Sequence, residues 1–195
     1  MNRQDTLVAF KILSLNIQHR DKGEEDRASV DSPYEIEALC QSLCLARLDI
    51  VASIEKLKHA GLLMAGRSYP LQANSYALMG LAKFAYRYLF PVKPGESKLG
   101  MATAHGAHPM NKRLFSAGNR IPVWPTPSGI VEGYSIDPIH PMVPRAVTHD
   151  HVLYELFVLL DSLRLGGARE RGVASDLLAE MLQIPTGWIG RNPFP

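Results

Sequence analysis

The sequence predicts a mainly α-helical protein with two helical regions separated by an irregular one. Three observations lead to this prediction. Apolar residues recur at helical spacing over residues 32–63, the same spacing returns over residues 148–181, and residues 92–128 show no periodicity. We therefore expect three consecutive parts, residues 1–72, 73–145 and 146–195.

Composition indicates a globular protein without a membrane span. The 195 residues are 46% hydrophobic and 21% charged, and no window approaches the 18 consecutive apolar residues of a transmembrane helix. The N-terminus lacks the small-residue cleavage site of a signal peptide. We interpret Cys40 and Cys44, one helical turn apart, as core cysteines of a reducing cytoplasm, since metal binding needs more ligands than two thiols.

Charge is distributed unevenly along the chain. The formal net charge of +2 divides into −1 over residues 1–69, +5 over residues 70–145 and −2 over residues 146–195. The irregular residues 92–128 hold much of the positive charge. This basic segment could contact a nucleic-acid backbone or an acidic partner, or simply form a solvated surface loop.

The first expected helix runs from Asp5 or Thr6, as its cap, to about Gln18. Apolar residues lie on two of its sides, which is typical of a buried helix or of one in an interface. Core packing and a homodimer seam both fit this pattern. Residues 19–31 are charged and aperiodic, which favours an exposed linker.

Residues 32–63 predict two helices joined by a tight turn. Ser32, with a proline after it and Glu35 three positions on, has the pattern of a capping box at the start of the first helix. A break is expected over residues 44–46. In the second helix Ile50, Ile54 and Leu57 share one face, and Gly61 ends it.

The run Leu-Lys-His-Ala-Gly-Leu at residues 57–62 resembles the end of the recognition helix in winged helix-turn-helix proteins of the MarR-like bacterial regulator type. The resemblance covers residues 5 to about 70 and implies a winged-helix-like domain. There is room after Leu63 for only a short or degenerate wing around Gly66 and Arg67.

The resemblance implies a dimeric transcriptional regulator that binds duplex DNA through the outward face of its second helix. The candidate nucleic-acid-binding residues are Ser32, Tyr34, Arg47, Leu48, Val51, Ala52, Lys56, Lys58 and Arg67. On that face only Arg47 is a good donor to bases, and Leu48, Val51 and Ala52 suit thymine methyl groups. The alternatives are that this face packs against later segments of the chain, or that the protein is an adaptor or antitoxin-like partner that binds another protein.

The middle of the chain predicts one helix and an irregular segment. The helix starts after Asn74 or Ser75 and must end at Pro91. Its alternating aromatic and basic residues are typical of a core face with snorkelling cations, although aromatics so placed can also stack on bases. Residues 121–124 and 130–136 could be the strands of a β-hairpin. His105 and His108 lack neighbouring metal ligands, so we expect no metal.

The C-terminal part predicts a helical hairpin. Thr148 or Asp150 caps its first helix, and Gly166 and Gly167 form its turn. Charged residues around that turn fit either a local ion-pair and capping network or an anion site. The candidates for anion or partner contact are Arg164, Arg169, Arg171, Lys112 and Arg113.

Residues 122–125 and 153–171 resemble a C-terminal module of uncharacterised bacterial proteins that carry helix-turn-helix-like N-termini. This resemblance implies an architecture and no chemistry. The chain has no Gly-x-Ser-x-Gly elbow, and both cysteines lie on an apolar helix face. We therefore expect no enzymatic activity and no cofactor.

Overall fold

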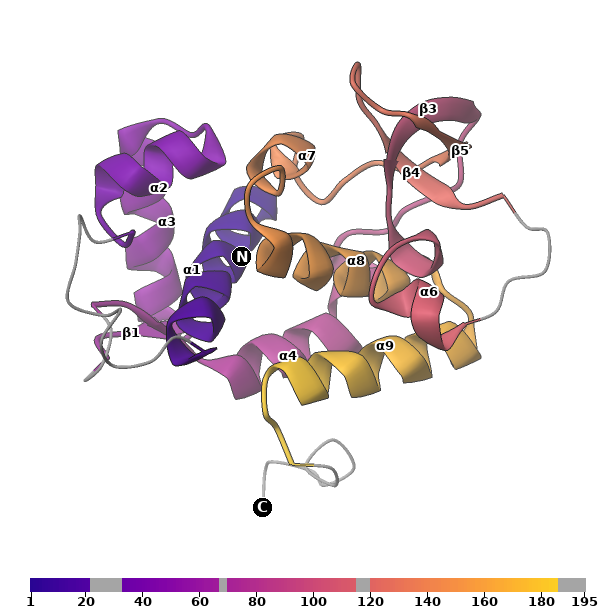
Figure 1. Ribbon diagram of the computed structural model, residues 1–195. Helices are drawn as coiled ribbons and strands as arrows, with labels where there is room; N and C mark the ends of the chain where they lie inside the picture. The colour runs from indigo at the N-terminus through magenta and orange to yellow at the C-terminus, as the bar shows by residue number, and fades with distance from the viewer. Residues whose placement is uncertain (22–32, 67–69, 115–119, 186–195) are drawn as a thin grey trace. The chain divides into compact units, whose positions relative to one another are not determined.

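The protein is mainly helical, with 57% helix and 11% strand, which confirms the predicted fold class. The computed structural model describes residues 1–21, 33–66, 70–114 and 120–185 (Figure 1). The chain folds as two compact units. The first holds Met1–Asn74 and Ile139–Tyr154, and the second holds Ser75–Pro138 and Glu155–Pro195. Each unit combines two separate stretches, which differs from the three consecutive parts we expected.

The first unit opens with helix α1, Arg3–Asp21, which extends further at both ends than predicted. Asn2 caps it, rather than Asp5 or Thr6. The Asn2 side chain accepts the Asp5 N–H at 2.7 Å, and the Asp5 carboxylate accepts the Asn2 N–H at 2.9 Å. These reciprocal bonds satisfy backbone donors at the helix start. Both apolar stripes of α1 are buried within the chain, so core packing accounts for them, and a homodimer stays a prediction.

Helices α2, Ile36–Leu43, and α3, Arg47–His59, form the predicted helical pair. The predicted capping box is wrong. Glu35 is itself the cap position of α2 and makes no side-chain cap bond, and Ser32 lies outside the described residues. The turn between the helices begins at Cys44, which has a left-handed backbone with φ 53° and donates its N–H to the Cys40 carbonyl.

The inward face of α3 is as predicted: Ile50, Ile54 and Leu57 are buried. Gly61 follows the helix with φ 68°, a conformation that glycine adopts without strain. A two-stranded antiparallel pair comes next, formed by β1, Leu63–Met64, and β2, Gln72–Ala73. The strands are only two residues long, so this element is short, as expected after Leu63.

Asn16 of α1 holds the β2 end of this pair. Its side-chain oxygen accepts the Ala73 N–H at 2.8 Å, and its amide nitrogen donates to the Leu71 carbonyl at 3.0 Å. The same nitrogen lies 2.9 Å from the Tyr34 hydroxyl oxygen. One side chain of α1 thereby positions both β2 and the segment before α2.

The second stretch of the first unit contains α7, Val143–Ala146, and the first turn of α8, His151–Leu165. Asp150 caps α8, as predicted, because its Oδ1 accepts the Leu153 N–H at 2.9 Å. Helix α7 contacts α2, so this late stretch of sequence packs on the helical pair.

The second unit begins with α4, Ser75–Phe84, and α5, Tyr86–Leu89. We expected one helix up to Pro91, but it breaks at Ala85, where φ is −112°. The Ala85 carbonyl then accepts the N–H groups of the next turn. After the break, Tyr86 is completely buried. Its ring packs edge-on against the Phe90 ring, with the ring centroids 5.3 Å apart.

The described residues between 92 and 128 form regular elements, so this part of the prediction is wrong. They contain β3, Ser97–Ala102, a 3₁₀ turn at Ala104–Gly106, α6, Met110–Arg113, and β4, Pro122–Pro125. With β5, Val131–Ser135, the strands form a small closed barrel (Figure 1).

The predicted β-hairpin is also wrong, because β4 and β5 run parallel to each other. Strand β3 pairs antiparallel with both of them. Gly100 makes this possible: it is opposite Pro125 on one side and Val131 on the other, and a Cβ at this position would lie 2.2 Å from the Trp124 carbonyl oxygen. The close approach excludes any side chain there.

The predicted C-terminal helical pair is confirmed as α8 and α9, Ala168–Met181, joined at Gly166 and Gly167. The Glu170 carboxylate accepts the Gly167 N–H at the start of α9. Arg171 donates to the Gly166 carbonyl at 2.6 Å, which further ties down the turn. Among the helices described, none has the length and apolar character needed to cross a bilayer.

Candidate functional site

The outward face of α3 is exposed, as a recognition surface requires. Leu48 is 82% exposed and Val51 39% exposed, and Ala52 beside them is also exposed. These positions are three and four residues apart and share one face of the helix. An exposed leucine with exposed apolar neighbours on one helix face is consistent with a surface that binds another molecule.

Two of the basic residues predicted to contact DNA already have acidic partners. Arg47 is paired with Glu37 of α2, and Lys58 lies 3.2 Å from Glu55. All four side chains are largely exposed, and such surface pairs contribute little to stability, so phosphates could replace the carboxylates. Lys56 is exposed and has no acidic partner in the described part of the chain.

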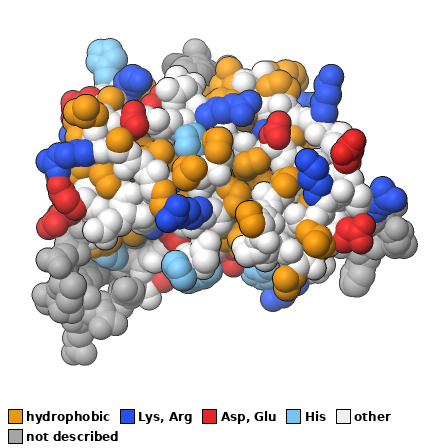
Figure 2. Space-filling model, turned by 90° about the horizontal axis from the view of Figure 1, so that it is seen from above, with side chains coloured by type: hydrophobic (Ala, Val, Ile, Leu, Met, Phe, Trp, Pro, Cys, Tyr) orange, Lys and Arg blue, Asp and Glu red, His pale blue; other side chains and the backbone are white. Residues whose placement is uncertain are grey.

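The molecular surface shows the same mixture of charges. On the face drawn in Figure 2, Lys and Arg side chains lie scattered among acidic and apolar ones. A groove that binds DNA by charge alone would present a continuous basic area. On α3 itself the cations are few, and Arg47 and Lys58 are already paired with acids, so any contact of α3 with DNA must depend on shape and on a few cations.

Tyr34 is not a nucleic-acid contact. Its side chain is 5% exposed, its hydroxyl group meets Asn16, and its ring lies edge-on to His19 with centroids 5.4 Å apart. The prediction failed because the helix starts after Glu35, which turns Tyr34 inward. Ser32 and Arg67, the other predicted contacts outside α3, are not among the described residues.

Arg164 is not a surface anion site either. It is buried in the second unit, where its Nη1 lies 2.5 Å from the Asp161 carboxylate and its Nε donates to the Phe90 carbonyl at 2.8 Å. Two further donors meet the same carboxylate: Thr103 at 2.9 Å and the Trp124 indole at 2.7 Å. Burial raises the pKa of the Asp161 carboxyl, whereas Arg164 and the two hydrogen bonds oppose that effect.

The remaining candidates for anion contact do not form one site. Arg171 bonds the Gly166 carbonyl, Arg113 lies 3.7 Å from Glu180, and Arg169 and Lys112 are exposed. These contacts fit the alternative of a local capping and ion-pair network. The structure brings no two of these arginines to a common acceptor within the described ranges.

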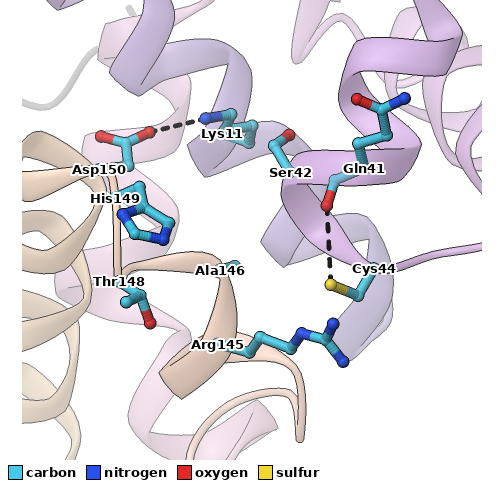
Figure 3. Close-up of a pocket in the computed structure, with 9 residues that line it drawn as sticks. All are labelled: Lys11, Gln41, Ser42, Cys44, Arg145, Ala146, Thr148, His149 and Asp150. Atoms are coloured by element: carbon cyan, nitrogen blue, oxygen red, sulfur yellow. Dashed lines mark hydrogen bonds and ion pairs between the residues drawn. The ribbon is translucent and has the colours of Figure 1, made fainter.

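The sequence analysis missed a cavity in the first unit, whose lining includes several polar and charged side chains (Figure 3). Its volume is about 460 Å³. It is lined by residues of α1, the end of α2 and the segment from α7 to α8: Lys11, Gln41, Ser42, Cys44, Arg145, Ala146, Thr148, His149 and Asp150.

The inner wall of the cavity contains a buried ion pair. Lys11 Nζ lies 2.8 Å from Asp150 Oδ2, and both side chains are less than one-tenth exposed. Ser14 and Gln18 each donate to the other carboxylate oxygen at 2.8 Å. One signal for this pair was visible in the sequence: Lys11 interrupts an otherwise apolar region of the first helix.

Among the described residues, no three His, Cys, Asp or Glu side chains are grouped as metal ligands. His108, one of the two histidines considered for metal, instead pairs with Glu155 at 3.0 Å. No family model, no curated protein and no solved structure matches this chain. The interpretation of its function therefore depends on the geometry of these surfaces.

Proposed function

We propose that the first unit binds duplex DNA through α3, and that the protein is a cytoplasmic transcriptional regulator acting as a dimer. One observation carries this proposal: the helical pair α2 and α3, with its tight turn at Cys44, is followed by a short β pair and leaves the outward face of α3 exposed. A second helix of such a pair is the element that enters the major groove in DNA-binding proteins of this build.

In this proposal the N-terminal half of α3 contacts bases. Arg47 donates to guanine, while Leu48, Val51 and Ala52 meet thymine methyl groups. Lys56 and Lys58, nearer the helix end, meet phosphates. About two to four phosphate contacts per copy give weak binding, so a second copy on a neighbouring half-site, about 34 Å away, is needed for tight binding.

Fluorescence anisotropy with a random-sequence duplex across a salt series tests the proposal. We expect binding at low salt. A plot of log K against the logarithm of the salt concentration should have a slope of about −0.9 for each phosphate that the protein neutralises. For a duplex sequence selected for tight binding to the parent protein, Arg47→Ala should weaken binding by roughly fivefold or more. Arg113→Ala is the matched control, because Arg113 is also an exposed arginine paired with an exposed glutamate.

A second function, binding of a partner protein, has its own supporting observation. The apolar residues Leu48 and Val51 are bordered by cations that Glu37 and Glu55 already neutralise, which resembles an apolar interface centre with a polar rim. Removing the acid that neutralises Arg47 affects DNA binding directly, so it distinguishes the two functions.

Glu37→Gln separates the two functions. It leaves Arg47 without its carboxylate, so DNA affinity should rise if α3 enters a groove. If α3 binds a protein instead, the variant shows no DNA binding at low salt, and Leu48→Asp releases a co-purifying protein that Arg113→Ala retains. Absence of DNA binding by both the parent protein and Glu37→Gln would refute the DNA proposal.

A further inference from the structure

The cavity of the first unit contains a cation with unused hydrogen-bonding capacity. Lys11 is 7% exposed, and its ammonium group has one hydrogen-bond partner among the described residues, Asp150. An ammonium group has three N–H donors. Two of them are therefore left for whatever occupies the cavity, at a depth where unsatisfied donors are unfavourable.

Asp150 is already engaged by four donors. Its Oδ1 already accepts from Ser14, Gln18 and the Leu153 N–H, and its Oδ2 accepts from Lys11. Because the carboxylate accepts four hydrogen bonds, it is held in one orientation, and it neutralises one positive charge. The remaining charged groups then decide the sign of the site.

Those groups are basic. Arg145 and His149 line the same cavity, and neither side chain has an ion-pair or hydrogen-bond partner in the part of the chain that the structure describes. Figure 3 shows the Arg145 side chain reaching from α7 toward the side of the cavity where Cys44 lies. With Lys11 balanced by Asp150, Arg145 gives the cavity a net positive charge.

We propose that this cavity binds a small organic oxyanion, with its carboxylate or phosphate group between Lys11 and Arg145. The volume of about 460 Å³ exceeds what an inorganic ion fills. It lies within the range of roughly 300–1,000 Å³ that is typical of small-molecule sites. Charge-assisted bonds from an ammonium and a guanidinium group are the donors that such anions prefer. The site does not depend on α3 or on DNA binding.

Cys44 lines the cavity and provides a reporter for its occupancy. In a Cys40→Ser background, the rate of Cys44 alkylation by iodoacetamide is measured with benzoate, phenyl phosphate or the neutral benzamide present. We expect the anions to slow alkylation in a saturable manner and benzamide to leave it unchanged. Protection by benzoate alone identifies a carboxylate site, and protection by phenyl phosphate alone identifies a phosphate ester site.

Arg145→Gln tests the assignment of the residues, because Arg145 is exposed and its replacement leaves the buried ion pair intact. It should weaken protection by about tenfold or more. Lys98→Gln on β3 removes an exposed charge from the second unit and should change nothing. Three results would overturn the proposal. The first is that neither anion protects Cys44 at millimolar concentration, and the second is that benzamide protects it equally well. The third is that protection is undiminished in Arg145→Gln.

Discussion

The indole nitrogen of Trp124 donates a 2.7 Å hydrogen bond to the carboxylate of Asp161, and both side chains are fully buried in the second unit. This bond joins strand β4 of the barrel to helix α8. Arg164 and Thr103 bond the same carboxylate, so one acidic group organises four parts of the unit: β4, α8 and the segments that contain Thr103 and Phe90.

Asp161→Asn should destabilise the protein strongly. The substitution leaves the Arg164 guanidinium buried without its counter-ion, and breaking such a pair costs about 3–5 kcal/mol. Chemical denaturation followed by circular dichroism measures the loss. Asp176→Asn on the exposed face of α9 is the control, and it should lie within about 0.5 kcal/mol of the parent. A loss in Asp161→Asn no larger than that of the control would contradict a structural role for this pair.

Asn16→Ala should loosen the β1–β2 pair without unfolding the first unit. It removes the acceptor of the Ala73 N–H and the donor to the Leu71 carbonyl. Hydrogen exchange should show faster exchange at the Ala73 amide, while amides within α3 keep their protection. Asn111→Ala on the exposed side of α6 serves as the control. An unchanged Ala73 exchange rate would mean that other contacts hold β2.

Protonation of His140 should lower the stability of the folded protein in mildly acidic solution. Burial lowers the pKa of this imidazole from 6.5, and the Arg3 charge lowers it further. Its Nδ1 also accepts the Met142 N–H at 3.1 Å, which only the unprotonated nitrogen can do. The unfolded chain therefore takes up a proton at higher pH than the folded one, so this contribution to stability is present above pH 6.5 and is lost as pH falls through the folded pKa.

An NMR titration of the His140 ring measures this effect directly. The midpoint should lie below 6.5 and should move upward in Arg3→Gln, because one of the two causes is removed. If the midpoint does not change in Arg3→Gln, burial alone lowers the pKa of His140, and the contribution expected from Arg3 is contradicted.

Tyr134 should lower the stability of the folded protein in alkaline solution. Burial, with a smaller contribution from the Glu170 charge, raises the pKa of this phenol from 10.0 to about 12. Between these values the unfolded chain ionises and the folded chain does not, so stability falls as pH rises above 10. The NMR shift of the labelled Tyr134 ring reports its titration. Glu170→Gln should lower the midpoint somewhat, whereas Glu132→Gln should leave it unchanged.

Local patterns in the sequence correctly predicted helix faces and helix boundaries, which depend on residues close together in the chain. Helical spacing placed Ile50, Ile54 and Leu57 inside, and Gly61 and Asp150 marked helix boundaries correctly. Each of these features depends on contacts with residues a few positions away or on one backbone angle. The exposed face of α3 follows from the same periodicity.

Features that depend on distant residues were missed. Strand β3 has the sequence Ser-Lys-Leu-Gly-Met-Ala, which shows no clean alternation, and it becomes a strand by pairing with β4 and β5 further along the chain. The buried ion pair joins Lys11 to Asp150, 139 positions away. The break at Ala85 was missed because burial of Tyr86, a tertiary effect, outweighs helix propensity there.

The interleaving of the two units determines the order in which the molecule can be completed during synthesis. Lys11 and Ser14 leave the ribosome early, but Asp150 follows only after the whole barrel has been translated. A nascent chain that stops after Asn74 would therefore contain the helical pair without the acid that neutralises its buried lysine. Folding of the first stretch of this unit must therefore wait for its second stretch.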